Sequence, residues 1–378
     1  MATREPPTVR WGIIVCTDAM EATGRISSWF VEDLVINRSD AKASHIIQAV
    51  GSSSLEKGND FVARYCGKSN PSVYGAYSQV YDDPDVDIVY IGTPHAFHKQ
   101  NCLDAIAKGK AVLCEKPLTM NARDAREVFD AARERGVYVA EAMWLRHRPL
   151  VHDLRKLIYK DKRIGEVFRA FSDFGVEMDI PNLPETSRYK QPSLGAGSLL
   201  DLGIYSITWA ILALEEEPGS NPDDLTLNGV QTHWHGVEVT SSALLRYAST
   251  GRQGIVTSTT MTNGNPDMLA RVQGTHGSIE VHGPFPARPT SFTVFPKFTD
   301  TLVDGLGDGV VVRGEGIKFD YPHAGRGFHF EADNTAVDYV SGKLESSIVS
   351  WSETIRVMEI MDELRSQGGT KYSQDLDA

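Results

Sequence analysis

The segment Gly109-Lys-Ala-Val-Leu-Cys-Glu-Lys-Pro-Leu118 decides the fold of this chain. Its apolar run Ala111–Cys114 predicts a short, buried strand. A helical pattern from Asn121 to Arg135 follows, Gly136 ends it, and a second apolar run, Val137–Ala140, comes next. Strand, helix and strand joined by short connections predict a parallel β–α–β unit.

The same alternation extends toward the N-terminus. Strands are predicted at Val9–Val15, His45–Val50 and Val86–Ile91, and helices at Ile26–Leu34, Leu55–Tyr65 and Ala96–Ala107. Continuous apolar strands are typical of a doubly wound parallel sheet that helices cover on both faces. Ligands bind beyond the carboxyl ends of such strands, so we look for functional residues directly after them.

The second half of the chain has a different pattern. Runs rich in Val, Thr and Phe alternate with turn signals and predict a large, mostly antiparallel sheet. The predicted strands are Val167–Asp173, Gly236–Tyr247, Gly254–Met261, Leu269–Gln273, Ser278–Val281 and Ser291–Phe295, and the predicted helices are Leu150–Ile158, Ile204–Leu214, Glu331–Tyr339 and Trp351–Arg365. Because 378 residues exceed what one core usually organises, we expect two α/β domains, residues 1–145 and 146–378.

Composition excludes several classes of protein. The formal charge of −12 gives no general attraction to nucleic acid or to an anionic membrane. No apolar run approaches the ~20 residues that a spanning helix needs, and the first residues do not resemble a signal peptide. Cys16, Cys66, Cys102 and Cys114 lie far apart, which favours reduced thiols and a cytoplasmic location.

The first strand leads into a candidate phosphate-binding turn. Parallel sheets that bind nucleotides carry a glycine-rich turn here, at the N-terminus of the next helix. The stretch that comes nearest to this pattern contains Ala22, Thr23, Gly24, Arg25 and Ile26, with a single glycine. These residues are our candidates for holding a pyrophosphate; the alternative is a simple turn that enters a helix.

The second strand is followed by Ser52, Ser53 and Ser54, and then by Lys57. Domains of this kind that bind NAD usually place a carboxylate there for the ribose hydroxyls. Hydroxyl groups and an ammonium suit a 2′-phosphate better, so the sequence predicts NADP. Ser54 also suits an N-cap of the following helix, and the two interpretations are compatible.

Four motifs carry a family resemblance. They are Glu115-Lys-Pro117, Thr93-Pro-His-Ala-Phe-His98, Gly195-Ala-Gly-Ser-Leu-Leu-Asp-Leu-Gly-Ile-Tyr205 and Gly327-Phe-His-Phe-Glu331. From Trp11 to about Arg365 the chain resembles the Gfo/Idh/MocA oxidoreductases, named after glucose–fructose oxidoreductase, inositol dehydrogenase and a rhizopine-catabolism protein. The resemblance implies a Rossmann dinucleotide-binding domain followed by a domain for substrate binding and dimerisation.

One branch of that family is similar in further detail. Tyr205 and the phrase Glu141-Ala-Met-Trp-Leu-Arg146 resemble the fungal NADP-dependent D-xylose 1-dehydrogenases and the dimeric dihydrodiol dehydrogenases. The resemblance implies a homodimer and a sugar or diol substrate. It assigns Lys116, Asp201 and Tyr205 to catalysis, Trp144 and Arg146 with Asp201 and Tyr205 to substrate binding, and Thr93, Pro94, His95, His98, Glu115 and Lys116 to the cofactor.

Elementary chemistry supports the catalytic group. Oxidation of a hydroxyl carbon requires a base to remove a proton while hydride leaves. A phenol titrates near pH 10, and a neighbouring ammonium such as Lys116 lowers that value. Asp201 and Tyr205, four residues apart, lie on one face of a helix. Taken singly, a core tyrosine and a helix cap are the alternatives for these two residues.

Three functions follow as hypotheses. The first is oxidation of D-xylose, or a related aldose, at C1 to the lactone. The second is a trans-1,2-dihydrobenzene-1,2-diol dehydrogenase, and the third is a dinucleotide-binding sensor or co-repressor without catalysis. We expect no metal, because the pairs His95 and His98, and His233 and His235, lack a further ligand at suitable spacing.

The sequence differs from the pattern of that branch of the family at Val15–Glu21, an extra segment between the first strand and the glycine turn. This insertion brings Asp18 and Glu21 to the place where the pyrophosphate is expected. Either the segment bulges into solvent and leaves Ala22–Gly24 in place, or it disrupts cofactor binding.

Overall fold

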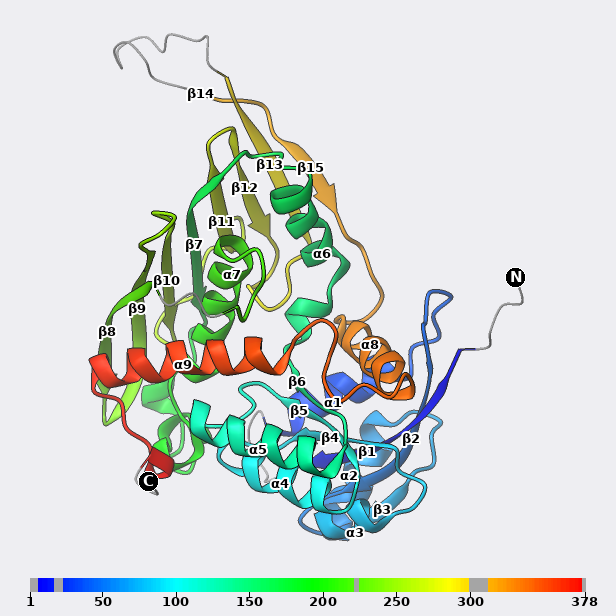
Figure 1. Ribbon diagram of the computed structural model, residues 1–378. Helices are drawn as coiled ribbons and strands as arrows, with labels where there is room; N and C mark the ends of the chain where they lie inside the picture. The colour runs from blue at the N-terminus through cyan, green and yellow to red at the C-terminus, as the bar shows by residue number, and fades with distance from the viewer. Residues whose placement is uncertain (1–5, 17–22, 221–223, 299–311, 376–378) are drawn as a thin grey trace.

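The computed structural model describes residues 6–16, 23–220, 224–298 and 312–375. Residues 17–22 lie outside this set, and with them most of the Val15–Glu21 insertion and the candidate cofactor residue Ala22. The described residues form two sheets, each with its own helices (Figure 1).

The first sheet has six parallel strands in the order β3-β2-β1-β4-β5-β6. The strands are β1 (Thr8–Val15), β2 (Ser44–Gly51), β3 (Ser72–Tyr74), β4 (Ile88–Gly92), β5 (Ala111–Glu115) and β6 (Val139–Ala142). The helices are α1 (Thr23–Leu34), α2 (Leu55–Tyr65), α3 (Tyr77–Asp82), α4 (His95–Ala107) and α5 (Ala122–Arg135). The strand order reverses between β1 and β4, and that switch point is where ligands bind in such sheets.

The prediction of a doubly wound parallel sheet is confirmed. Every residue of β4 and β5 is buried, which explains why both strands are uninterrupted apolar runs. β3 and α3 were not predicted from the sequence, because elements of three and six residues are too short to show a period.

The second sheet contains nine strands among the described residues, in the order β14-β13-β12-β11-β7-β10-β9-β8, and β15 pairs with β13. Only the β7–β10 pair is parallel. The strands are β7 (Val167–Gly175), β8 (Leu225–Trp234), β9 (Val237–Tyr247), β10 (Gln253–Thr259), β11 (Ala270–Gly274), β12 (Gly277–His282), β13 (Ser291–Phe298), β14 (Val312–Arg313) and β15 (Ile317–Asp320). The prediction of a large, mostly antiparallel sheet is therefore confirmed.

The helices of the second half are α6 (Pro149–Arg155), α7 (Ile204–Leu214), α8 (Phe328–Val340) and α9 (Trp351–Gly368). Figure 1 shows α6 and α7 on one face of the second sheet, with α9 crossing between the two sheets. Within the described chain, Pro192–Leu214 is the stretch long and apolar enough to cross a membrane. In its most apolar 18-residue window 94% of the residues are buried, and every residue of α7 is buried, so α7 is a core helix of this domain.

Strand β8 was not predicted, because its residues alternate between half-buried and exposed and lack an apolar run. His233 and His235 do not lie on one face of a strand. His235 lies in the β8–β9 hairpin turn with a φ of 49°, a left-handed conformation that takes it out of the strand.

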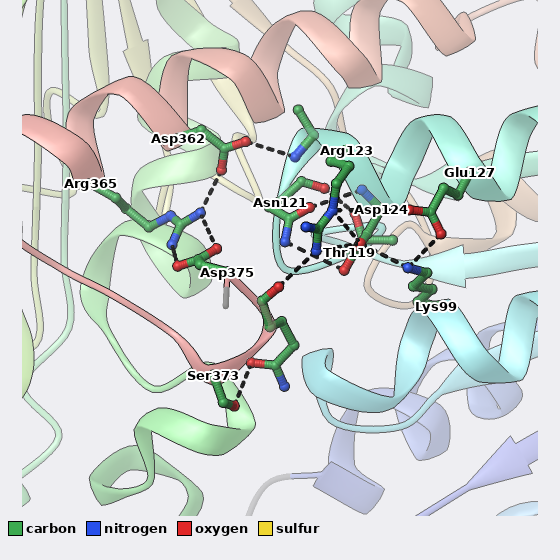
Figure 2. A network of polar contacts seen from close by, with 12 residues as sticks. Lys99, Thr119, Asn121, Arg123, Asp124, Glu127, Asp362, Arg365, Ser373 and Asp375 are labelled. Atoms are coloured by element: carbon green, nitrogen blue, oxygen red, sulfur yellow. Dashed lines mark hydrogen bonds and ion pairs between the residues drawn. The ribbon is translucent and has the colours of Figure 1, made fainter. Parts of the chain in front are cut away.

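The C-terminal segment fastens the two halves together (Figure 2). Asp362 on α9 accepts a hydrogen bond of 2.8 Å from the backbone N–H of Ala122, at the start of α5. Arg365 pairs with both Asp362, at 2.6 Å, and Asp375, at 2.7 Å. Arg123 on α5 donates to the carbonyl oxygen of Gln374 at 2.8 Å. These contacts fix the position of α5 relative to α9.

Candidate active site

A cavity of about 210 Å³ opens beyond the carboxyl ends of β4 and β5, at the junction of the two sheets. The predicted site residues in its lining are Arg25, Ile26, Thr93, Pro94, His95, His98, Glu115, Lys116, Trp144, Asp201 and Tyr205. The structure therefore brings together residues of the loop after β4, the loop after β5, the segment after β6 and the start of α7.

Lys116 and Asp201 form the charged centre of the cavity. The Lys116 Nζ donates to the Asp201 Oδ1 at 3.0 Å and to the Asp201 carbonyl oxygen at 2.7 Å. Arg188 approaches the other carboxylate oxygen, Oδ2, at 3.2 Å. Burial raises the pKa of Asp201, but the charges of Lys116 and Arg188 outweigh it and hold that pKa well below its usual range. Asp201 is therefore a carboxylate at neutral pH.

Asp201 and Tyr205 reach the same cavity because the helix begins earlier than the sequence predicts. A π-helical turn over Leu199–Gly203 precedes α7 and continues into it. The glycine-rich approach to this turn is required by packing. Gly197 has a φ of 145°, and a Cβ there would lie 2.9 Å from an oxygen of Glu238.

The Tyr205 hydroxyl is held by an aromatic neighbour. It accepts a hydrogen bond of 2.6 Å from the Trp144 indole nitrogen, and the Lys116 Nζ lies 5.1 Å from the centre of its ring. Burial, followed by the charge of Glu115, raises the pKa of Tyr205 well above its ordinary value. We expected Lys116 to lower this pKa; instead its ammonium is bound to Asp201 and the phenol stays protonated.

Glu115, which precedes the lysine, is fully enclosed. Tyr90 on β4 donates to one of its oxygens at 2.5 Å. Burial raises the pKa of Glu115 to about 7, although this hydrogen bond and the charge of Lys116 oppose the shift. The contact ties the end of β5 to the neighbouring strand and so positions the backbone that carries Lys116.

His98 and His95 have different surroundings. His98 contacts the carbonyl oxygens of Thr93, at 2.7 Å, and Pro117, at 2.9 Å, and thereby joins the loops that follow β4 and β5. The Nδ1 of His95 is buried and has no hydrogen-bond partner among the described residues. Burial lowers the pKa of both rings, so both are neutral at pH 7.

The candidate 2′-phosphate site lies at the carboxyl end of β2, outside this cavity. Ser54 caps α2 and accepts from the Lys57 backbone N–H at 3.3 Å. The Lys57 Nζ donates to the Ser53 hydroxyl at 3.1 Å, and Ser52 is buried beside them. Hydroxyls, an ammonium and a helix N-terminus thus meet at one place, which fits a phosphate.

The structure does not bring Arg146 to the cavity. Its guanidinium is buried against Glu353 on α9, with contacts of 2.5 and 2.9 Å. Both carboxylate oxygens are thereby satisfied, and Arg146 fastens the segment after β6 to α9. In the predicted glycine turn, Thr23 and Gly24 are the first two residues of α1. The next two residues, Arg25 and Ile26, line the cavity.

Several lining residues were missed from the sequence: Trp29, Phe174, Arg188, Tyr189, Leu202, Phe285 and Ala287. Arg188 lies in a three-residue helical turn within an irregular segment, where no period marks it. Trp29 lies within the predicted helix Ile26–Leu34, and Phe174 directly follows the predicted strand Val167–Asp173. The tertiary fold brings Phe174 to Tyr205, with 5.6 Å between their ring centres.

Among the parts of the chain that the structure describes, no group of three His, Cys, Asp or Glu side chains is arranged to hold a metal ion. The charged centre of the cavity instead holds a single carboxylate, that of Asp201, between the two cations Lys116 and Arg188.

Comparison with known proteins identifies the family. Residues 22–143 match the oxidoreductase family model with the NAD-binding Rossmann fold, and residues 151–280 match the GFO/IDH/MocA C-terminal domain. The chain is 32% identical to a D-xylose 1-dehydrogenase (NADP(+)) of Hypocrea jecorina, with 99% of this chain and 95% of that protein covered. The chain belongs to the Gfo/Idh/MocA family. It is an NAD(P)-dependent oxidoreductase of the kind that acts on CH–OH groups.

Other known proteins show how broad the similarity is. A trans-1,2-dihydrobenzene-1,2-diol dehydrogenase of Xenopus laevis is 33% identical over 96% of this chain and 99% of that protein. Levoglucosan dehydrogenase in complex with NADH and levoglucosan has the same fold, with a TM-score of 0.76, 19% identity and coverage of 96% of this chain and 97% of that chain. The 3-ketoreductase KijD10 of Actinomadura kijaniata in complex with NADP gives a TM-score of 0.71 at 22% identity, covering 97% and 99%.

Proposed function

We propose that this protein is an NADP-dependent dehydrogenase that oxidises D-xylose, or a related aldose, at C1 to the lactone. The observation that carries the proposal is the junction of Lys116, Asp201 and Tyr205 in one cavity at the switch point of the sheet. The domain assignment is part of the proposal: residues 1–145 hold the cofactor, and residues 146–378 hold the substrate.

In this proposal the charged centre orients the substrate hydroxyls. Asp201 stays ionised between Lys116 and Arg188, so it accepts hydrogen bonds from a polyol and carries no proton itself. The aromatic rings of Trp144, Phe174 and Phe285 supply apolar walls for the faces of a sugar ring. A small cavity with a few fixed polar groups and aromatic walls suits a compact sugar.

Tyr205 is the proposed general acid and base. Its hydroxyl accepts from Trp144, which leaves its own proton available for a substrate oxygen. The neutral phenol is ready to donate in the reductive direction. In the oxidative direction it must first lose that proton, so the raised pKa makes oxidation dependent on alkaline pH.

The residues at the end of β2 support NADP as the cofactor. Ser53 and Lys57, at the capped start of α2, provide a hydroxyl and an ammonium for the 2′-phosphate. Arg25, Thr93 and His95 line the same cavity as Lys116 and are the residues we propose for the rest of the dinucleotide. When bound, NADP accepts the hydride. The pyrophosphate of NADP is also the group that we predicted Ala22, Thr23, Gly24 and Ile26 to hold.

A second candidate substrate is a trans-dihydrodiol. The aromatic walls of the cavity favour an arene ring as much as a pyranose, and the Xenopus laevis relative is named for that activity. A sensor without catalysis is less well supported, because Lys116, Asp201 and Tyr205 are all present and in reach of one another.

We also propose a homodimer that works in the cytoplasm. The outward face of the second sheet carries apolar side chains, with Leu244 on β9 53% exposed beside the buried Ala243 and Leu245. Cys66, Cys102 and Cys114 form no disulfide among the described residues, which suits a reducing compartment. Light scattering would test the dimer, and Leu244→Asp is expected to yield monomers.

The test of function is NADP reduction, followed at the nicotinamide absorbance band, over a panel of sugars and a trans-dihydrodiol. We expect turnover with D-xylose and loss of that turnover in Tyr205→Phe. Turnover with the trans-dihydrodiol alone would show that the diol is the substrate in place of D-xylose. The proposed catalytic residues would then stay the same. Unchanged turnover in Tyr205→Phe would show that Tyr205 is not the general acid and base.

A further inference from the structure

The catalytic cavity contains more hydrogen-bonding groups than the described chain itself uses. The lining side chains that keep such a group without a partner among the described residues are His95, Lys116, Arg188, Tyr189 and Tyr205. All of these groups lie around one space of about 210 Å³. A ligand that fills this space must bond to them or leave them unpaired, which costs free energy.

Arg188 supplies a group that a ligand can reach. Its Nη2 donates to the Asp201 Oδ2 at 3.2 Å and to the Tyr189 hydroxyl at 3.0 Å. Its Nη1 makes no hydrogen bond with any described residue and, unlike its Nε, is not shielded from solvent. The Arg188 side chain is 19% exposed and lines the cavity. Nη1 is therefore an available donor in the cavity wall.

Two neighbours fix the orientation of this guanidinium. Asp201 and Tyr189 both accept from Nη2, and the guanidinium carbon lies 4.2 Å from the centre of the Tyr189 ring. The Tyr189 hydroxyl is the acceptor in this contact, so its own proton remains available to a ligand. Arg188 and Tyr189 thus form a pair of donors whose geometry is set before a ligand arrives.

Asp201 stands between this pair and the reacting groups. Its Oδ1 accepts from Lys116 at 3.0 Å, whereas its Oδ2 accepts from Arg188. The Lys116 Nζ lies 5.1 Å from the centre of the Tyr205 ring, on the side where the proton is transferred in the proposed reaction. A substrate whose reacting hydroxyl lies at Tyr205 therefore meets Arg188 with atoms further along its ring.

We propose that Arg188, oriented by Tyr189, binds substrate oxygens away from the reacting carbon and so selects a polyhydroxylated ring over an arene diol. This inference rests on the proposed function, in which both kinds of substrate are candidates.

The two candidate substrates differ in what they offer these donors. When C1 of D-xylopyranose lies at Tyr205, its ring oxygen and three further hydroxyl groups remain as acceptors. A trans-dihydrodiol has one further hydroxyl, on the adjacent carbon, and its other carbons carry no oxygen. The bound diol would remove the Arg188 Nη1 from water and leave it unpaired. A site built to bond an oxygen discriminates against an analogue that lacks it.

The main test is the ratio of kcat/KM for D-xylose to kcat/KM for trans-1,2-dihydrobenzene-1,2-diol. Arg188→Lys keeps a positive charge near Asp201 but has no planar, two-pronged head. We expect the ratio to fall about 10- to 100-fold, the range for one hydrogen bond to a charged group. Effects that act through Asp201 alone change both substrates and cancel in the ratio. Arg64→Lys, exposed on α2, is the matched control and is expected to keep the ratio.

Tyr189→Phe tests the same pair by a smaller change that does not depend on how well Arg188→Lys folds. It keeps the ring beside the guanidinium and removes only the hydroxyl. We expect the ratio to fall about three- to tenfold, the size of one neutral hydrogen bond, with most of the change in KM for D-xylose.

A binding measurement separates this proposal from the proposed function. 1,5-Anhydroxylitol keeps the ring oxygen and three hydroxyl groups of D-xylose but has no hydroxyl at C1 to oxidise. We expect calorimetric titration, with and without NADP, to show that Arg188→Lys weakens its binding by about tenfold. That result in a protein that does not oxidise D-xylose would overturn the proposed reaction and still support Arg188 as a sugar-binding residue.

Two results would overturn the proposal. An unchanged ratio in both Arg188→Lys and Tyr189→Phe would show that Arg188 acts only through Asp201. Weaker binding of NADP in Arg188→Lys, together with unchanged binding of 1,5-anhydroxylitol, would assign the free Nη1 to the cofactor instead of the sugar.

Discussion

The two ends of the proposed dinucleotide site are built in different ways. At the Lys116 end, buried side chains from β5, the turn before α7, the segment after β6 and the Arg188 turn interlock. At the Ser52–Lys57 end, the contacts that define the site join residues within one loop and the first turn of α2. The proposed catalytic group thus depends on tertiary assembly, whereas the residues proposed to select between the cofactors are local in sequence.

The largest effect is expected at the buried end. Tyr205→Phe removes the proton donor while the ring keeps its contact with Phe174. We expect kcat for sugar oxidation to fall by about 10²–10⁴-fold, the usual contribution of a positioned acid or base. Steady-state kinetics measures this, with Tyr65→Phe on α2 as a control that retains activity. A loss of less than tenfold would move the base to another residue.

The same residue predicts a pH profile. Because burial raises the pKa of Tyr205, the protonated form persists through neutral pH and oxidation requires its loss. The rate of oxidation should therefore rise with pH through the alkaline range, and the rate of the reverse reduction should not. Rate profiles in both directions check the sign. A rate of oxidation that levels off near neutral pH would contradict the proposed role of the phenol.

Asp201→Asn is expected to have the next largest effect. It leaves Lys116 and Arg188 without their shared carboxylate, so substrate hydroxyls lose an acceptor and the two cations repel. We expect kcat/KM to fall by about 10²-fold, a size typical of one fixed polar group in an active site. Asp130→Asn, an exposed position on α5, is the matched control. Equal losses in both variants would indicate a general effect on folding.

Deletion of the Val15–Glu21 insertion is expected to have a moderate effect on the affinity for NADP. Deletion of Val15–Glu21 removes Asp18 and Glu21 from the expected path of the pyrophosphate. If the segment disrupts binding, the Kd for NADP falls by about tenfold, or ~1.4 kcal/mol. An unchanged Kd by titration calorimetry would support the alternative, that the segment bulges into solvent.

The smallest effect is expected at the exposed end. Lys57→Ala removes an ammonium that lies on a helix surface, so we expect affinity for NADP to fall about two- to fivefold, with affinity for NAD unchanged. Lys68→Ala, just after the same helix, is the control. Equal weakening toward both cofactors would show that Lys57 does not contact the 2′-phosphate.

Much of this site could be predicted from the sequence, because the patterns that mark it are local. Lys116 follows a buried strand within a short motif, and Asp201 and Tyr205 share one helical face, so all three were predicted. Ser54 as a helix cap was confirmed for the same reason.

What the sequence could not give depends on contacts between distant segments. Arg188 has no periodic context, and its partner Asp201 is recognisable only in the folded chain. Arg146 follows the predicted strand as expected, but Glu353, more than two hundred residues away, turns it from the cavity. The pKa of Tyr205 is governed by burial, which no spacing of charges along the chain reveals.

Helix α9 has a consequence for how molecules enter and leave. It is bound to the first half of the chain at two places, through Trp351 and the Val139 carbonyl oxygen near its start and through Asp362 and the Ala122 backbone N–H nearer its end. Figure 2 shows the second of these places. A hinge motion that separates the two sheets would have to break both hydrogen bonds together. Exchange of cofactor and product is therefore expected to use short movements of surface segments, on a faster timescale than rotation of whole domains.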